Sequence, residues 1–233
     1  MSPIKRFLPL IILLLAVLAA FALGLDDYVS FEQLERNHAR LLDFVDRHPL
    51  LAPLVFMLIY ATVIALSIPG GAVLTIAGGF LFGVVAATCY VVIAATLGAT
   101  VVFLVAKTAL GDSLRHKAGP AMRRMEAGFR ENALNYLLFL RLIPVFPFWL
   151  VNLVPAFLGV PLRTYVVATA VGIIPGSLVY ASVGNGLGVV FETGGRPDLG
   201  IIFKPEIILP IIGLAVLAML PVAYKKIKAR QPT

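Results

Sequence analysis

The chain has 233 residues, of which 60% are hydrophobic and 13% charged, and its formal net charge is +7. Soluble proteins carry about 25% charged residues, so this composition excludes an ordinary water-soluble domain and predicts an integral membrane protein. A single cysteine excludes a disulfide-stapled scaffold, and three histidines far apart in the sequence offer no metal-ligand spacing. We therefore expect no metal, no cofactor and no enzymatic activity.

The first 49 residues predict two different helices. Residues 7–25 carry no charge and follow Lys5 and Arg6, so residues 1–27 are expected to form an N-terminal transmembrane helix. A signal peptide is the alternative, but the apolar stretch is longer than usual and no clear cleavage site follows it. Residues 28–49 have an apolar stripe and a charged remainder, which predict an amphipathic interfacial helix with Ser30 at its start. The stripe consists of Phe31, Leu34, Leu41 and Val45.

Residues 50–83 are apolar but contain Pro69-Gly70-Gly71 and then Gly78-Gly79 before Gly83. Proline removes a backbone donor and paired glycines tolerate unusual dihedral angles, so one straight helix is not expected here. Either residues 50–68 cross the bilayer, or residues 50–83 form a re-entrant hairpin with its tip at the Pro-Gly-Gly turn. Residues 84–106 then predict a transmembrane helix rich in small residues.

The second half of the chain has a similar order. A basic segment at residues 107–131 is expected to lie on anionic lipid, and a second hairpin is predicted at residues 132–159. A span at residues 163–190, broken at Pro175-Gly176, ends the core at 50–190. An external loop at 191–206 leads to a last domain at 207–233, a transmembrane helix followed by a basic tail. The second hairpin is punctuated by Pro144, Pro147 and Pro155 and ends at Gly159.

These two halves indicate an internal repeat. Pro69 pairs with Pro144 at an offset of 75 residues, and Tyr90 pairs with Tyr165 at the same offset. Chance similarity between apolar segments is the alternative. If both broken segments are re-entrant, thirteen Lys and Arg residues lie on the side of the two termini and five on the other, which agrees with the positive-inside rule. The predicted fold is an all-α membrane protein with an inverted repeat of hairpin plus span, a transporter pattern.

Arg141 is the charge most relevant to function, because it lies nine residues into an apolar arm. Charge inside a membrane is unfavourable unless it faces a partner or a wet cavity, and a guanidinium fork suits phosphate or carboxylate. The alternative is that Arg141 extends to the interface or binds carbonyls freed by Pro144. Gly70 and Gly71 are candidates for offering backbone amides to the same headgroup, and Asn152 for a hydrogen bond. For these residues, a purely structural role in the hairpins is equally open.

Tyr90, Tyr165 and Tyr180 are expected to be packing or interfacial residues rather than part of a binding site. Every acidic residue lies in a predicted loop or interfacial segment, so no catalytic pair of carboxylates is expected in the membrane.

Two motifs resemble the DedA superfamily, in particular its VTT-domain branch, also called SNARE-associated Golgi proteins. They are residues 69–83, with Pro69-Gly70-Gly71 and Phe80-Leu81-Phe82-Gly83, and residues 139–159, with Arg141, Asn152 and Gly159. The resemblance implies paired re-entrant hairpins and lipid movement, because relatives resemble phospholipid scramblases or undecaprenyl phosphate flippases. The chain departs at Gly71, where many DedA proteins have glutamate, and it lacks their second arginine.

The sequence therefore predicts a transporter or scramblase for phospholipid or polyprenyl phosphate, with anionic lipids as partners and no nucleic acid. The expected location is a bacterial inner membrane, with both termini in the cytoplasm. Two alternatives are a membrane-organising scaffold that does not transport, and a transporter of small solutes or protons. The missing intramembrane acid counts against proton transport.

Overall fold

A computed structural model of the chain describes residues 30–117, 131–143, 148–187 and 203–228 continuously, with scattered single positions elsewhere. These residues form helices and no strand, which confirms the all-α prediction. Within the described residues, three helical stretches are long and apolar enough to cross a membrane: Val84–Thr108, Leu162–Asn185 and Pro205–Tyr224. The chain is thus an all-α integral membrane protein. Most of the span predicted at residues 7–25 lies outside the described residues.

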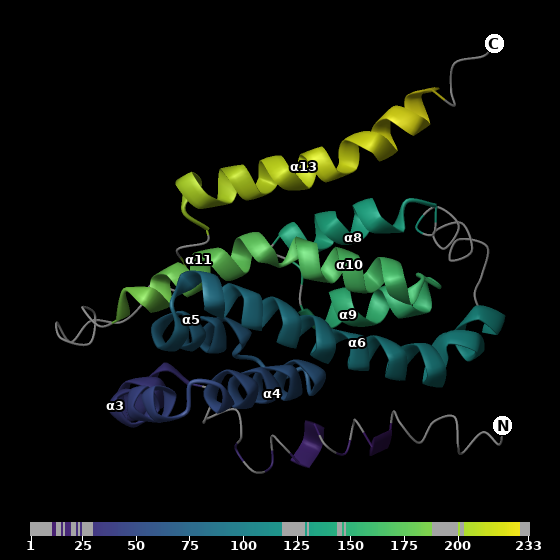
Figure 1. Ribbon diagram of the computed structural model, residues 1–233. Coiled ribbons are helices and arrows are strands. Elements are labelled where there is room, and N and C mark those ends of the chain that lie inside the picture. The colour runs from purple at the N-terminus through teal and green to yellow at the C-terminus, as the bar shows by residue number, and fades with distance from the viewer. Residues whose placement is uncertain are drawn as a thin grey trace.

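Helix α3 (Phe31–Arg47) is the amphipathic helix that the sequence predicts. The Ser30 hydroxyl accepts a hydrogen bond from the Gln33 amide at 3.3 Å, as expected of an N-cap residue. Its apolar stripe packs on the bundle, with Leu34 buried and Leu41 against the same cluster as Ile76. Figure 1 shows α3 end-on beside the lengthwise helices, so α3 crosses one end of the bundle.

The first broken segment forms two helices, α4 (Leu51–Ala65) and α5 (Gly71–Phe82), followed by α6 (Val84–Lys117). The break between α4 and α5 contains two residues with positive φ, Ser67 at 53° and Gly70 at 131°. Gly83 at φ 76° allows the sharp passage from α5 into α6. The hairpin at 50–83 therefore has its turn at the Pro-Gly-Gly sequence.

Two details of this half differ from the prediction. Helix α5 runs through Gly78 and Gly79 without a break. These glycines serve close packing between helices: a Cβ atom on Gly78 would lie 2.7 Å from the Phe56 ring. Helix α6 continues eleven residues beyond the predicted end at Ala106, because residues 107–117 contain no proline. The basic segment therefore begins as a continuation of the spanning helix.

The second broken segment forms α8 (Ala133–Leu142) and α9 (Phe148–Phe157). Pro144 and Pro147 lie outside the described residues. Pro155, one of the prolines that punctuate the predicted hairpin, does not interrupt the helix: it lies inside α9. Its carbonyl accepts the Val160 amide at the end of the helix, and Gly159 at φ 68° turns the chain there.

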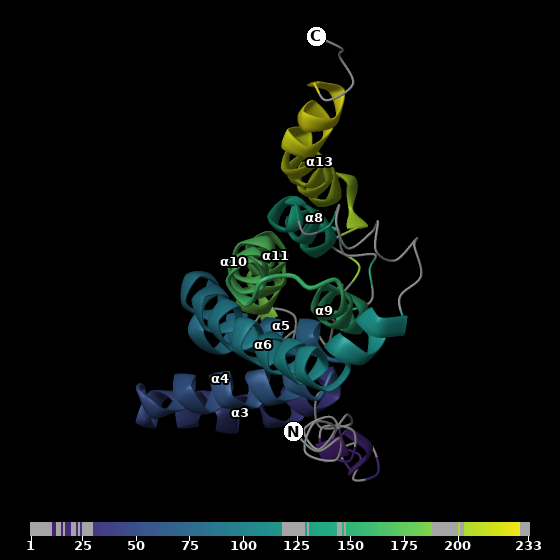
Figure 2. The same cartoon turned by 90° about the vertical axis from the view of Figure 1, so that its right-hand side faces the viewer.

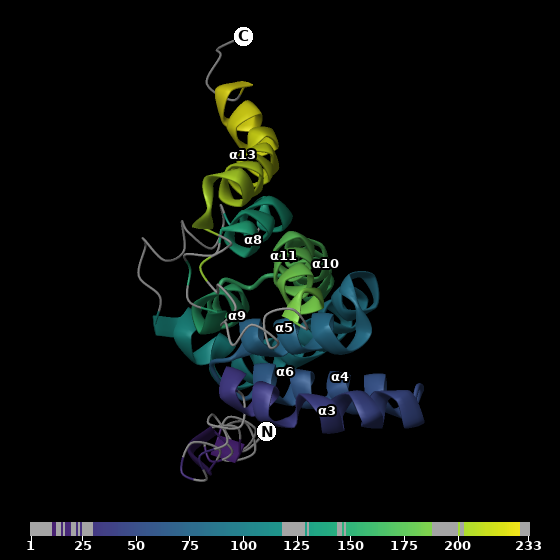
Figure 3. The same ribbon diagram turned by 90° about the vertical axis from the view of Figure 1, so that its left-hand side faces the viewer.

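The last helices are α10 (Leu162–Gly172), α11 (Ile174–Asn185) and α13 (Pro205–Lys228). The break between α10 and α11 falls at Ile173, just before Pro175, because proline has no amide to continue the helical hydrogen bonds. Helix α13 packs mainly on α8, where Asn135 donates a hydrogen bond to the Ala218 carbonyl at 2.7 Å. Figures 2 and 3 show α13 at the edge of the molecule beyond α8.

The two halves pack in corresponding ways. In each half the first hairpin arm lies along the span of its own half, α4 along α6 and α8 along α10. The second arm packs on a span of the other half, α5 on α11 and α9 on α6, although α5 also contacts α6 of its own half. The two arms of one hairpin barely touch each other. The halves are therefore interlocked, and each hairpin needs the other half to bury its second arm.

Candidate functional site

Arg141 lies in the last turn of α8, on the side facing α9 and α10. Its Nη2 atom lies 2.8 Å from Asn152 Oδ1, 2.9 Å from the Tyr165 hydroxyl and 2.9 Å from Thr169 Oγ1. All three acceptors are neutral oxygens, and all three residues are almost fully buried. Two helices, α9 and α10, therefore hold one end of the guanidinium group in a defined position.

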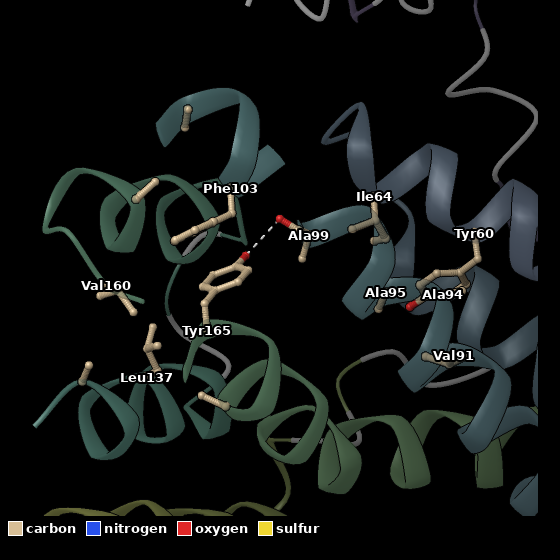
Figure 4. Close-up of a cluster of buried hydrophobic side chains, with 14 of the residues drawn as sticks. Tyr60, Ile64, Val91, Ala94, Ala95, Ala99, Phe103, Leu137, Val160 and Tyr165 are labelled. Atoms are coloured by element: carbon tan, nitrogen blue, oxygen red, sulfur yellow. Dashed lines mark hydrogen bonds between the residues drawn. The ribbon is translucent and has the colours of Figure 1, made fainter. Parts of the chain in front are cut away.

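Tyr165 is the centre of this hydrogen-bond network. Its hydroxyl lies 2.9 Å from Asn152 Oδ1 and 3.2 Å from the Ala99 carbonyl, so it can donate to either oxygen. Its ring stacks on Phe103, with centroids 4.3 Å apart, and the Arg141 guanidinium lies 5.4 Å from the Tyr165 centroid. Figure 4 shows Tyr165 reaching from α10 toward Ala99 on α6. Tyr165 thus connects the arginine to the central helix of the first half.

Gly172 allows α8 to approach α10 closely at this point. A Cβ atom there would lie 2.6 Å from the Arg141 Cβ, which is too short for real contacts. In the first half Gly98 has the corresponding role, because its Cβ would lie 2.5 Å from the Ala61 carbonyl oxygen. The arginine is therefore placed against Tyr165 and Thr169 by a helix contact that only glycine permits.

A cavity of about 470 Å³ lies between the tip of the first hairpin and the end of α8, with α11 contributing to its wall. This volume is in the usual range for small-molecule sites. Its lining brings together Gly70 and Gly71 from the tip of the first hairpin with Arg141 from α8, the first arm of the second hairpin. Polar side chains on the wall come from Tyr60, Ser67, Thr75, Ser177 and Tyr180. Among the described residues of the lining there is no aspartate or glutamate, so arginine supplies the formal charge on this wall.

The N-terminus of α5 also lines this cavity, through Gly70, Gly71 and Ala72. Gly70 is the N-cap, it offers no side chain, and its φ of 131° is accessible to glycine. The amides of Gly71, Ala72 and Val73 precede the first helical hydrogen bond, which runs from the Leu74 amide to the Gly70 carbonyl. Free amides and the helix dipole make such an end attractive to anions. Arg141 and this helix end therefore face one cavity.

The other candidate residues have different positions. Asn152 does not line the cavity: it is fully buried behind Arg141 and positions the guanidinium instead. Pro69 lines the cavity at the tip. Gly79 packs on α11, where an added Cβ would lie 2.1 Å from the Ala181 carbonyl oxygen. The structure thus brings Arg141, Gly70 and Gly71 together and assigns the others to support.

Tyr165, expected to be a packing residue, belongs to the arginine network, and Thr169 was not a candidate at all. Both were hidden in an apolar segment where tyrosine and threonine are common. Helical spacing offered one signal, because residues 165 and 169 are four apart and share a helix face. What identifies them as partners of Arg141 is the packing of α10 on α8.

Comparison with known sequences agrees with this architecture. Residues 68–186 match the VTT domain, which is about half of the chain and contains Pro69-Gly70-Gly71, Arg141 and most of the residues that line the cavity. The chain belongs to the VTT-domain family. The match begins at Ile68 next to the Pro-Gly-Gly turn and ends just after α11. The family domain therefore covers most of the site, while Tyr60, Ile64 and Ser67 of the lining precede it.

Several curated relatives are similar to this member of the VTT-domain family. Transmembrane protein 41 homolog from Dictyostelium discoideum is 28% identical over 190 residues, covering 80% of this chain and 55% of the relative. Transmembrane protein 41B from Homo sapiens is 32% identical over 124 residues, or 53% of this chain and 40% of the relative. The Caenorhabditis elegans homolog is 27% identical over 173 residues, 73% of this chain and 68% of the relative. The chain thus spans about half the length of the first relatives. No solved structure matches it.

Proposed function

We propose that this VTT-domain protein moves phosphate-bearing lipids across a membrane, and that the headgroup passes through the cavity between the hairpin tips. The observation that carries the proposal is the meeting of Arg141 and the α5 N-terminus at one cavity inside the apolar bundle. A lipid headgroup is the anion that a membrane-embedded site of this kind would encounter most often. Phospholipid and polyprenyl phosphate both carry the phosphate that such donors recognise.

In this proposal both broken segments are re-entrant hairpins that enter the membrane from opposite sides. Their helices support this, because α4, α5 and α8 have only 10 to 15 residues each and are short for a full crossing. A headgroup at the tips would then be reached from either leaflet with a small movement of one hairpin. The apolar helices around the cavity would leave the acyl chains in lipid.

We further propose that the termini and the C-terminal end of α6 face the cytoplasm of a bacterial inner membrane. Figure 1 shows the ends of α6 and α13 at one end of the bundle and α3 at the other. Thirteen of the nineteen Lys and Arg residues fall on the proposed cytoplasmic side. The positive-inside rule supports this orientation.

The test is transport by the purified full-length chain in phosphatidylcholine vesicles. Fluorescent phosphatidylglycerol or a fluorescent polyprenyl phosphate is added in trace amounts, and a membrane-impermeant quencher reports how fast it changes leaflets. We expect acceleration over empty vesicles for at least one of these lipids, and loss of that acceleration in Arg141→Ala. No acceleration for either lipid would overturn the proposal. A scaffold that does not transport would instead tolerate Arg141→Ala.

A further inference from the structure

Ser67, at the tip of the first hairpin, has an unusual backbone conformation. Its φ is +53°, and among the described residues Ser67 is the only non-glycine residue with a positive φ. The left-handed region disfavours residues that have a Cβ atom, so glycine would fit this position with less strain. Strained residues are retained mostly where they contribute to function. Ser67 lines the cavity, and its hydroxyl has no hydrogen bond to any other described residue.

Ser177 presents a second hydroxyl to the same cavity from α11. It is 7% exposed, and it too has no side-chain hydrogen bond to another described residue. Most serine and threonine hydroxyls on the described helices donate to the carbonyl four residues earlier. These hydroxyls belong to Thr62, Thr75, Thr88, Thr100, Thr108 and Ser182. For Ser177 the carbonyl four residues earlier is that of Ile173. The Ser177 backbone amide donates to this carbonyl at 3.0 Å, but the Ser177 hydroxyl does not.

From these observations we propose that Ser67 and Ser177 are binding residues that donate hydrogen bonds to the phosphate oxygens of the ligand. Both hydroxyls line the cavity that contains Arg141 and the first residues of α5. A phosphate group offers several acceptor oxygens, enough for arginine, backbone amides and two hydroxyls together. The serine at φ +53° is then kept because glycine would remove one of these donors.

This inference rests on the proposed function, because it assigns two more residues to the same phosphate site. It also separates the roles of the two hairpins. The second hairpin contributes charge through Arg141, whereas the first contributes neutral donors through Ser67 and the α5 amides. Ser177 adds a donor from α11, which packs directly on α5. The phosphate would therefore bridge both halves of the molecule.

The experiment measures binding by thermal stability of the purified chain in a phosphate-free nonionic detergent. A ligand that binds the folded state raises the melting temperature, and the increase grows with the logarithm of the ligand concentration divided by its Kd. Dihexanoyl phosphatidylglycerol and inorganic phosphate are titrated separately, which distinguishes a lipid headgroup from a free phosphate ion. The variants are Ser67→Ala, Ser67→Gly, Ser177→Ala and Arg141→Ala. Ser182→Ala is the matched control for Ser177→Ala. The Ser182 hydroxyl also lies on α11, but it donates to the Leu178 carbonyl.

We expect the apparent Kd of the lipid to rise about tenfold in Ser67→Ala, Ser67→Gly and Ser177→Ala, as for one lost hydrogen bond to a charged group. Ser67→Gly should match or exceed the wild-type melting temperature without ligand, because it relieves the strain at φ +53°. Ser182→Ala should bind like the wild type.

Three results would contradict the inference in different ways. If Arg141→Ala loses binding while all serine variants bind like the wild type, the phosphate site stands and the two hydroxyls are not part of it. If Ser67→Ala binds weakly but Ser67→Gly binds normally, the lost hydroxyl is not responsible, because both variants lack it. If the wild type binds neither probe, the proposed site itself is wrong.

Discussion

At the scale of single residues, Arg141 shows how a charge is accommodated inside an apolar bundle. An intramembrane arginine is destabilising by roughly 2.5–3.5 kcal/mol even on the lowest scales. Here three neutral oxygens lie within 2.9 Å of one of its nitrogens. Nη2 has only two hydrogens. Arginine can bind a phosphate through two of its nitrogens in two ways, and both of them use Nη2. A bidentate contact with a ligand therefore requires one protein acceptor to give way.

Replacing Arg141 with lysine tests how much of this geometry matters. Lysine keeps the charge but lacks the planar fork. Its single nitrogen cannot serve Asn152 and Tyr165 while a second nitrogen binds a ligand. We expect Arg141→Lys to reduce lipid transport by roughly tenfold to a hundredfold, as for lost hydrogen bonds to a charged group. Melting temperature is measured in parallel to exclude a folding defect. Full transport by a stable lysine variant would show that charge alone suffices.

Tyr165 offers a second test at the same scale. Tyr165→Phe keeps the stacking on Phe103 but removes the hydroxyl that accepts from Arg141. We expect the free energy of unfolding to fall by about 1–3 kcal/mol, because buried partners lose a hydrogen bond. Tyr90→Phe is the control, since the Tyr90 hydroxyl has no hydrogen bond to the described part of the chain; a change of about 0.5 kcal/mol or less is expected there. Equal effects in both variants would contradict the special role of Tyr165.

At the scale of helices, glycine contacts decide where the elements sit. Helices α5 and α11 touch through their backbones, because an added Cβ on Gly79 would lie 2.1 Å from the Ala181 carbonyl oxygen and one on Gly184 1.9 Å from the Ile76 carbonyl oxygen. Lipid tails are as apolar as the helices, so close packing rather than the hydrophobic effect holds helices together in a membrane. This contact fixes the first hairpin, and with it one wall of the cavity.

Gly79→Ala should therefore separate α5 from α11. We expect a loss of about 3 kcal/mol or more in the free energy of unfolding, since the clash is with backbone that cannot rotate away. Gly213→Ala is the matched control on α13, where an added Cβ meets no atom within 4 Å. That variant should stay within about 1 kcal/mol of the wild type. Melting in detergent compares the two, and similar stabilities would argue against the backbone contact.

At the scale of the whole molecule, the interlocked halves bring the tip of the first hairpin and the end of α8 to one cavity. The first hairpin starts next to α3, whereas α8 starts toward the other end of the bundle, the end at which α6 finishes (Figure 1). Each second arm is buried by the other half, so neither half forms the cavity alone. A site shared by two halves suits alternating access from the two leaflets.

The orientation of the whole molecule is tested by cysteine labelling in a Cys89→Ala background. We expect a cysteine at Arg40, on α3, to react with an impermeant reagent from outside intact cells. A cysteine at Lys117, at the end of α6, should react only after the cells are opened. Label reaching position 117 from outside would overturn both the orientation and the re-entrant hairpins.

The sequence by itself determined the class of protein, most helix positions and the importance of Arg141. These features depend on local properties: apolar length, charge, proline and glycine act through neighbouring residues, and a charge within an apolar arm stands out. Pro155 and Gly78-Gly79 show the limit, because the same residue types that break a helix in one place pack inside a helix in another.

Only the tertiary structure decided which residues surround Arg141 and what faces the cavity. Tyr165, Thr169, Ser67 and Ser177 are common residue types, and their roles arise from contacts between segments up to about a hundred residues apart. The interlocking of the halves also depends on which helices meet at their glycines. A close contact needs a suitable surface on both helices, and the sequence does not show which two surfaces come together. A hydroxyl that donates within its own helix and one that faces a cavity are identical in sequence, and packing alone distinguishes them.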